Sequence, residues 1–278
     1  MGLIKTVAVV NDLSSFGNCS LTAAVAILAA MGHRPCPLPT AVLSAQSEFP
    51  SFYEKDLTAS MPHYLDAWEA NHERFDGICT GYFARGGQLD HAAALLTRFR
   101  RDSTLTLVDP VMGDGGALYP GYDRSACAKM KELAARADVL TPNLTELCLL
   151  TGENYRAVTA HRGEADYFER IATLALPLAA GRGVIVTGVA DGGEIGNLVL
   201  SGGERRVIRT KRMGGRFSGT GDIFAAVVCG SMLRGDTLFT AAETAARFVG
   251  QAIADTVQSP HLGRYGVNYE KFLGNLTR

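Results

Sequence analysis

Short apolar segments alternate along this chain with longer segments whose apolar residues recur at helical spacing. The short segments predict strands at Thr6–Val10, Pro37–Leu43, Gly77–Thr80, Thr104–Val108, Val139–Thr141 and Gly183–Thr187. The longer segments predict helices at Ser20–Met31, Thr58–His72, Leu89–Arg101, Ser125–Arg136, Ala165–Ala179, Gly221–Leu233 and Leu238–Val257. This alternation is typical of βαβ units around a mostly parallel sheet. We therefore expect an α/β fold, with a β-hairpin formed by Leu198–Leu200 and Val207–Thr210.

The composition narrows the class of protein. The chain has 278 residues, of which 47% are hydrophobic and 20% charged, so it can bury a large core. No repeat or linker divides it, and we expect one domain over residues 1–278. A net charge of −1 gives no basic surface for nucleic acid, and no apolar run approaches the roughly 20 residues that span a bilayer. Six scattered cysteines without a C-x-x-C pair predict reduced thiols and a cytoplasmic protein.

One glycine-rich motif carries the strongest chemical signal. Ser218-Gly219-Thr220-Gly221-Asp222 stands directly before an apolar run that predicts a buried helix. Backbone N–H groups at a helix start stabilise anions. An acid beside such an anion hole makes chemical sense if it removes a proton from a hydroxyl while the N–H groups hold developing phosphoryl charge. Taken alone, the motif equally fits a glycine turn capped by an acid.

Polar residues follow each predicted strand, at the edge where open α/β sheets bind ligands. They include Asn11-Asp12, Ser44–Ser47, Gly81-Tyr82, Asp109–Gly116, Thr141–Glu146 and Thr187-Gly188. Asp109 and Glu146 are the natural pair for Mg²⁺, which prefers carboxylate, water and phosphate oxygens. Each also has a structural interpretation, because Asp-Pro often begins a turn and an acid in a first helical turn complements the helix dipole. The glycine-rich segment Gly113–Gly116 predicts a flap over phosphates or, in the simpler interpretation, a surface loop.

Several common sites are excluded by missing motifs. The chain has no G-x-x-x-x-G-K-[ST] phosphate loop, no complete G-x-G-x-x-G after the first strand and no G-x-S-x-G elbow. Its histidines show no spacing typical of metal ligands.

Three ordered motifs together resemble the ribokinase-like superfamily, in its vitamin-B6 and pyrimidine kinase branch. They are Asp109-Pro-Val-Met-Gly-Asp114, Thr141-Pro-Asn143-Leu-Thr-Glu146 and Gly219-Thr-Gly-Asp222, and the similarity runs through nearly the whole chain. Within the branch the chain looks most like the pyridoxal kinases. The resemblance implies a three-layer sandwich with helices on both faces of the sheet. It also implies ATP-dependent phosphorylation of a hydroxymethyl group on an aromatic nitrogen ring, with Mg²⁺, commonly K⁺, and a homodimer.

The same resemblance implies roles for single residues. Asp222 would be the general base, and the amides of Gly219, Thr220 and Gly221 the anion hole. Asp109 and Glu146 would organise Mg²⁺, directly or through water. The residues implied to contact ATP are Asp109, Asp114, Tyr119, Thr141, Asn143, Glu146, Thr187 and Gly219, with Asp114 and Tyr119 in the flap.

The residues implied to bind the ring are Asp12, Gln46, Ser47 and Tyr82. They are compatible with two ring systems, that of the B6 vitamers and that of hydroxymethylpyrimidine. Many pyridoxal kinases carry Ser where Asp12 stands, and Ser44-Ala45-Gln46-Ser47 is closer to the pyrimidine kinases. Leu13–Phe16, in contrast, is not the glycine-rich run usual in pyrimidine kinases, which favours the B6 side. The leading hypothesis is a B6-vitamer kinase, and the first alternative is a hydroxymethylpyrimidine (phosphate) kinase of thiamine synthesis. A non-catalytic B6- or nucleotide-binding protein is the third hypothesis, although such a protein is expected to lose Asp222 or a metal carboxylate.

Overall fold

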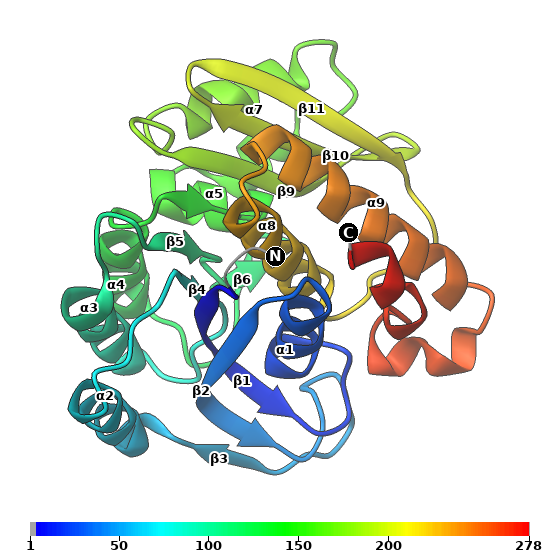
Figure 1. Cartoon of the computed structure of the whole chain (residues 1–278). Coiled ribbons are helices and arrows are strands. Elements are labelled where there is room, and N and C mark those ends of the chain that lie inside the picture. The colour runs from blue at the N-terminus through cyan, green and yellow to red at the C-terminus, as the bar shows by residue number, and fades with distance from the viewer. Residues whose placement is uncertain (1–3, 278) are drawn as a thin grey trace.

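A sheet with helices on both faces forms the frame of the molecule (Figure 1). The computed structural model describes residues 4–277, without the side chains of residues 260–262. The strands of the sheet lie in the order β11-β10-β9-β8-β5-β4-β1-β2-β3. In chain order they are β1 Thr6–Ser14, β2 Arg34–Leu43, β3 Glu54–Asp56, β4 Gly77–Thr80, β5 Leu105–Val108, β8 Val139–Leu140, β9 Gly183–Asp191, β10 Glu194–Ser201 and β11 Glu204–Lys211. The pairs from β9 through β2 are parallel, whereas β3, β10 and β11 join antiparallel to their neighbours.

Two layers of helices cover the two faces of this sheet. The first layer holds α1 Ser20–Ala30, α8 Thr220–Leu233 and α9 Leu238–Thr256, joined by the 3₁₀ helix η3 Glu270–Leu276. The second holds α2 Met61–Ala70, α3 Gln88–Phe99, α4 Arg124–Ala134, α5 Leu144–Thr151 and α7 Tyr167–Ala175. The remaining short elements are η1 Thr58–Ser60, α6 Tyr155–Thr159, η2 Pro260–Tyr265 and a small hairpin of β6 Gly113–Asp114 and β7 Ala117–Leu118.

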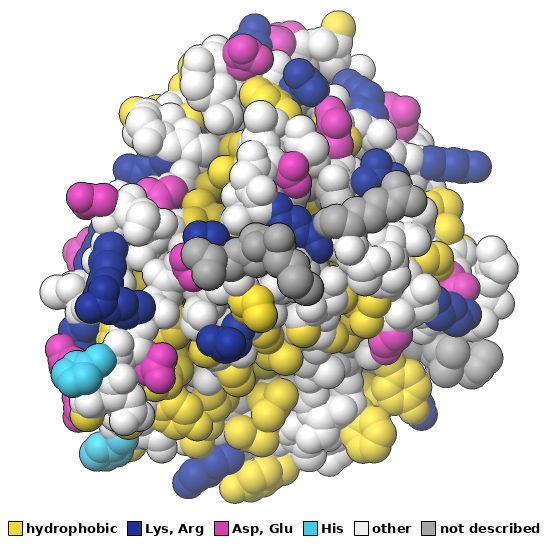
Figure 2. Space-filling view, viewed as in Figure 1, with side chains coloured by type: hydrophobic (Ala, Val, Ile, Leu, Met, Phe, Trp, Pro, Cys, Tyr) yellow, Lys and Arg dark blue, Asp and Glu magenta, His cyan; other side chains and the backbone are white. Residues whose placement is uncertain are grey.

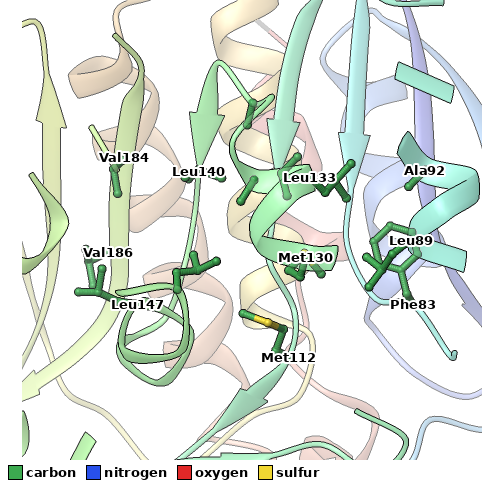
Figure 3. Close-up of a cluster of buried hydrophobic side chains, with 14 of the residues drawn as sticks. Phe83, Leu89, Ala92, Met112, Met130, Leu133, Leu140, Leu147, Val184 and Val186 are labelled. Carbon is green, nitrogen blue, oxygen red and sulfur yellow. The ribbon is translucent and has the colours of Figure 1, made fainter. Parts of the chain in front are cut away.

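Side-chain alternation along the strands divides the core into two. In β1, Val7 and Val9 pack toward the first helical layer, and Ala8 and Val10 toward the second. The second core is shown in Figure 3, where side chains of α3, α4 and α5 meet those of the sheet, such as Leu140 and Val184. The expected three-layer α/β fold is confirmed. Among the described residues, none of the helices has the length and apolar character needed to cross a bilayer.

Two expectations about local structure were wrong in detail. Asn11 and Asp12 were expected after the first strand, but β1 continues to Ser14 because β2 pairs with it over this length. The pairing shifts register between Asn11 and Leu13, so Asp12 lies at an irregularity of the ladder. The helix at Leu144–Thr151 was not predicted, because eight mostly apolar residues do not distinguish a short buried helix from a strand.

Candidate active site

The carboxyl ends of neighbouring parallel strands bring the predicted polar residues to one edge of the sheet. The ladder extends past the strands themselves: Asp109 N donates to Thr80 O at 3.0 Å, and Gly81 N donates to Val10 O at 2.8 Å. A small cavity at this edge is lined by Asn11, Thr80, Gly81, Asp109 and Asp222, among others. Residues more than 200 positions apart in the chain thus share one cavity.

The glycine-rich motif opens α8 at the same edge. Gly219 is the N-cap residue of α8 with φ of +82°, and a β-carbon there would collide with Asn18 O and Cys19. Only glycine fits this combination of left-handed backbone and close approach. At Gly221, a β-carbon would lie 3.8 Å from Asp109 Oδ2, which places the start of α8 beside the Asp109 carboxylate. The free N–H groups of the helix start and this acid therefore face the same space.

The Asp222 carboxylate is held by two donors from distant segments. Asn11 Nδ2 donates to Asp222 Oδ1 at 2.8 Å, and the backbone N–H of Ser20 donates to Asp222 Oδ2 at 2.9 Å. Ser20 has φ of +51°, a conformation that non-glycine residues seldom adopt and that concentrates at functional sites. Asn11 is fixed in turn, because its Oδ1 accepts from Asp12 N at 3.0 Å and from Tyr82 N at 2.9 Å.

The surroundings set the proton affinity of Asp222. Desolvation and the nearby charge of Asp12 raise the pKa of Asp222 to about 6, while the hydrogen bonds from Ser20 and Asn11 oppose the rise. A carboxylate with a pKa just below neutrality is ionised at pH 7 and is a stronger base than an ordinary Asp. The positions of Asn11 and Ser20 beside this group were not recognised in the sequence; the only signal for Asn11 was its place next to Asp12 near a strand end.

Asp109 and Glu146 are both buried at the centre of the edge. Thr141 Oγ1 donates to Asp109 Oδ1 at 3.0 Å. Burial and the neighbouring Asp222 raise the pKa of Asp109 to about 8, and burial and Asp109 raise the pKa of Glu146 well above its usual value. Buried carboxylates this close to one another resist ionisation unless a cation joins them. Two carboxylates are also what Mg²⁺ commonly uses when water and phosphate complete its shell, so the residues fit this ion. The described residues contain no cluster of three or more His, Cys, Asp and Glu side chains suited to a metal.

Glu146 has a structural task as well. It forms a capping box with Asn143: Asn143 N donates to Glu146 Oε2 at 2.8 Å, and Glu146 N donates to Asn143 Oδ1 at 3.0 Å. Glu146 Oε1 also accepts from Met112 N at 3.2 Å. The helix-cap interpretation and the metal interpretation therefore hold for the same side chain, because each carboxylate oxygen keeps a second lone pair.

The predicted flap is the β6–β7 hairpin. It is tied to α5 at two points: Asn143 Nδ2 donates to Gly113 O at the base at 2.9 Å, and Gly116 N in the turn donates to Thr145 Oγ1 at 3.0 Å. At its tip the Asp114 carboxylate is paired with Arg216, a residue the sequence analysis did not single out. Tyr119 closes the hairpin by donating from its N–H to Met112 O at 2.9 Å. Thr187 lies beside Asn143 across a β-bridge.

The predicted ring-binding residues lie at the β1 and β2 side of the edge and are less completely hydrogen-bonded. Ser14 Oγ donates to Asp12 Oδ2 at 2.8 Å, and burial raises the pKa of Asp12. Gln46 is only 3% exposed; its Nε2 donates to Arg264 O at 2.9 Å, while its Oε1 has no partner among the side chains and backbone that the structure describes. Tyr82 is half-buried and packs with the small cluster around Leu43. Ser47 lies in an exposed turn next to Gln46.

Comparisons with known proteins find relatives over most of the chain. The sequence profile described as phosphomethylpyrimidine kinase matches residues 73–267. A pyridoxine/pyridoxal/pyridoxamine kinase of Bordetella avium is 30% identical over 91% of this chain and 86% of that protein. A Bacteroides thetaiotaomicron protein provisionally assigned as a phosphomethylpyrimidine kinase, solved with pyridoxal, is 34% identical with a TM-score of 0.91 over 99% of this chain and 96% of that one. The pyridoxal kinase of Lactobacillus plantarum is 30% identical with a TM-score of 0.89 over 99% of this chain and 97% of that one.

Proposed function

Because the chain belongs to the phosphomethylpyrimidine kinase family, we propose that it is an ATP-dependent kinase of B6 vitamers. It transfers the γ-phosphoryl group to the 5′-hydroxymethyl group of pyridoxal, pyridoxine or pyridoxamine and forms pyridoxal 5′-phosphate or its analogues. The observation that carries the proposal is the Asp222 carboxylate, fixed by Asn11 and Ser20 at the start of α8 and next to Asp109. An acid held at a helix N-terminus beside a metal-type carboxylate is suited to phosphoryl transfer.

In this function Asp222 accepts the proton of the vitamer hydroxyl while the hydroxyl oxygen attacks the γ-phosphorus. The bond from that phosphorus to the bridging oxygen breaks, and ADP leaves with its electron pair. The amides of Gly219, Thr220 and Gly221 offset the negative charge that spreads over the transferred group. Asn11 holds the Asp222 carboxylate in position and favours its ionised form.

Asp109 and Glu146 would hold Mg²⁺, directly or through water, and the ion would supply positive charge against the phosphates. Thr141 and Asn143, which follow β8, and Thr187, within β9, face the phosphates. Asp114 and Tyr119 cover the phosphates from the flap. We assign K⁺ as the accompanying monovalent ion, to be tested by replacing it with Na⁺ in the assay.

The vitamer ring lies among Asp12, Gln46, Ser47 and Tyr82. The buried Oε1 of Gln46 can accept a hydrogen bond from a donor on the ligand, such as the ring hydroxyl of a B6 vitamer. The same oxygen suits the amino group of hydroxymethylpyrimidine, and this observation keeps that kinase as the second candidate.

One assay separates the candidates. Purified protein with Mg-ATP is offered pyridoxal, pyridoxine, pyridoxamine and hydroxymethylpyrimidine side by side, and ADP release is compared as kcat/KM. We expect the highest value for a B6 vitamer. A higher value for hydroxymethylpyrimidine would move the protein to thiamine synthesis, and no release with any of the four would refute the kinase function. Binding of pyridoxal without turnover would indicate a non-catalytic binding protein.

We further propose that the protein works as a homodimer in the cytoplasm. Exposed hydrophobic side chains gather at the edge of the sheet, as Figure 2 shows over the region of β1, β2 and β3, and they include Leu13, Val42, Phe52 and Tyr53. All six cysteines are free thiols, in keeping with a reducing compartment. Sedimentation velocity of the wild type and of Tyr53→Lys tests the dimer, which the lysine should weaken.

A further inference from the structure

Arg216 is a cation that lies between the flap and the start of α8. It lies three residues before Gly219, in the loop that leads into the anion hole, and its guanidinium pairs with Asp114 at the tip of the β6–β7 flap. A β-carbon built on Gly115 would lie 3.7 Å from Arg216 Nη1, so the guanidinium lies beside the turn of the flap. Within residues 4–277, Asp114 is the only one of the site acids Asp12, Asp109, Asp114, Glu146 and Asp222 that forms an ion pair, and Arg216 is its partner.

The contact joins the flap to the loop before α8. The flap itself is tied to α5, by Asn143 at its base and by Thr145 at its turn. The loop of Arg216 belongs instead to α8, where Thr220 Oγ1 donates to Phe217 O at 3.3 Å. The Arg216–Asp114 pair therefore connects the flap, which is bonded to the helix that carries Glu146, with the loop before the helix that carries Asp222.

We infer that Arg216 is a positioning residue for the nucleotide, acting as a clasp that holds the flap against the loop before α8. The side chains of Arg216 and Asp114 are 75% and 40% exposed. An ion pair this exposed contributes little to the stability of the folded protein. Its effect is instead on the flap, because an open flap leaves the phosphates accessible to water.

The inference rests on the proposed kinase function, so its first test needs no catalysis. Hydrogen–deuterium exchange of the flap peptide covering residues 113–119 is measured in the ligand-free protein for the wild type and Arg216→Gln. We expect exchange at the tip to be at least about threefold faster in the variant, with an unchanged melting temperature. Equal exchange would overturn the clasp whatever the protein catalyses.

The second test uses a double-mutant cycle. Arg216→Gln and Asp114→Asn should each raise the KM for ATP about three- to tenfold and increase vitamer-independent ATP hydrolysis, while the double variant is no worse than Asp114→Asn alone. The charge exchange Arg216→Asp with Asp114→Arg should recover part of the KM, which a merely structural role would not do. Additive effects of the two single changes would refute the clasp.

Arg206→Gln is the matched control. Arg206 forms an ion pair with Glu243 at 3.0 Å, with side-chain exposures of 52% and 48%, between β11 and α9. We expect this variant to keep the wild-type KM and the wild-type exchange of residues 113–119. If it changed both as much as Arg216→Gln does, the effects would reflect general loss of surface charge and the clasp would be wrong.

Discussion

The proposed site has two ends, which we call the metal end (Asp109, Thr141, Asn143 and Glu146) and the ring end (Asp12, Gln46 and Tyr82). The two ends differ in how their hydrogen bonds are completed. At the metal end both oxygens of Glu146 accept backbone N–H groups, and Asn143 is bonded at both ends of its amide. At the ring end the buried Oε1 of Gln46 has no partner within the described part of the chain. A rigid, complete frame suits a reaction centre that must not move, and an open acceptor suits a surface that a ligand completes. In the proposed function, the protein itself therefore holds the groups of the reaction centre, whereas recognition of the ring depends in part on a hydrogen bond that the substrate supplies.

The largest effect is expected at Asp222, between the two ends. Asp222→Asn removes the base, and we expect kcat to fall at least about 100-fold with little change in ATP affinity, measured by steady-state kinetics and calorimetry. The amide introduced at position 222 would also bring an N–H donor against the donor of Asn11 or of Ser20, so the substitution disturbs a contact as well as the base.

A paired exchange separates these two causes. In Asn11→Asp with Asp222→Asn, the amide of residue 222 donates to the new carboxylate, so the contact is remade without the base. Activity should stay low while the melting temperature recovers. Recovery of wild-type kcat would instead show that the contact, not the base at position 222, is what catalysis requires.

The next effect tests the metal end. Glu146→Gln keeps one oxygen for the capping box but loses the charge, so the Mg²⁺ concentration for half-maximal activity should rise about 10-fold or more. Asp123→Asn is the control, because Asp123 caps α4 by accepting from Ala126 N at 2.8 Å. Its Mg²⁺ titration should match the wild type. An unchanged titration in Glu146→Gln would remove Glu146 from the metal site.

The pH dependence is expected to be of similar size. Because burial and Asp12 raise the pKa of Asp222 to about 6, the base becomes protonated below that pH, and kcat/KM should fall about tenfold per pH unit there. The effect on stability has the opposite sign. A carboxyl whose pKa is raised by folding destabilises the folded state above that pKa, so the contribution of Asp222 to the free energy of unfolding increases as the pH falls from about 6 toward 4. Asn11→Ala removes a donor to the ionised form and should shift the acid limb of kcat/KM to higher pH. A limb at the same pH in this variant would contradict the role of Asn11.

The smallest effect tests the ring end against another buried glutamine. Gln88 is fully bonded, with Nε2 donating to Thr40 O at 2.8 Å and Oε1 accepting from Ala84 N at 2.8 Å. Gln46→Leu should raise the KM for the vitamer about fivefold. Gln88→Leu should leave that KM unchanged and lower the free energy of unfolding by about 1–3 kcal/mol, measured by urea denaturation, because it leaves buried polar groups unpaired. If the two variants behaved alike, the free oxygen of Gln46 would have no role in recognition.

The sequence by itself determined the parts that depend on neighbours in the chain. The strand and helix alternation predicted the layered fold, and the motif Gly219–Asp222 predicted the start of α8 with an acid in its first turn. Asn143 and Glu146, three residues apart, have the spacing of a capping box, although the helix that they cap was not predicted. Such contacts need only a few backbone angles, which local residue types specify.

The tertiary structure alone decided which distant groups meet. Asn11 and Ser20 reach Asp222 across 211 and 202 positions of the chain, and Arg216 reaches Asp114 across 102. These contacts depend on the order of the strands and on the packing of α1 against α8, which no short stretch of sequence encodes. The raised pKa values of Asp109 and Asp222 have the same origin, because burial and the approach of other acids exist only once the sheet edge is assembled.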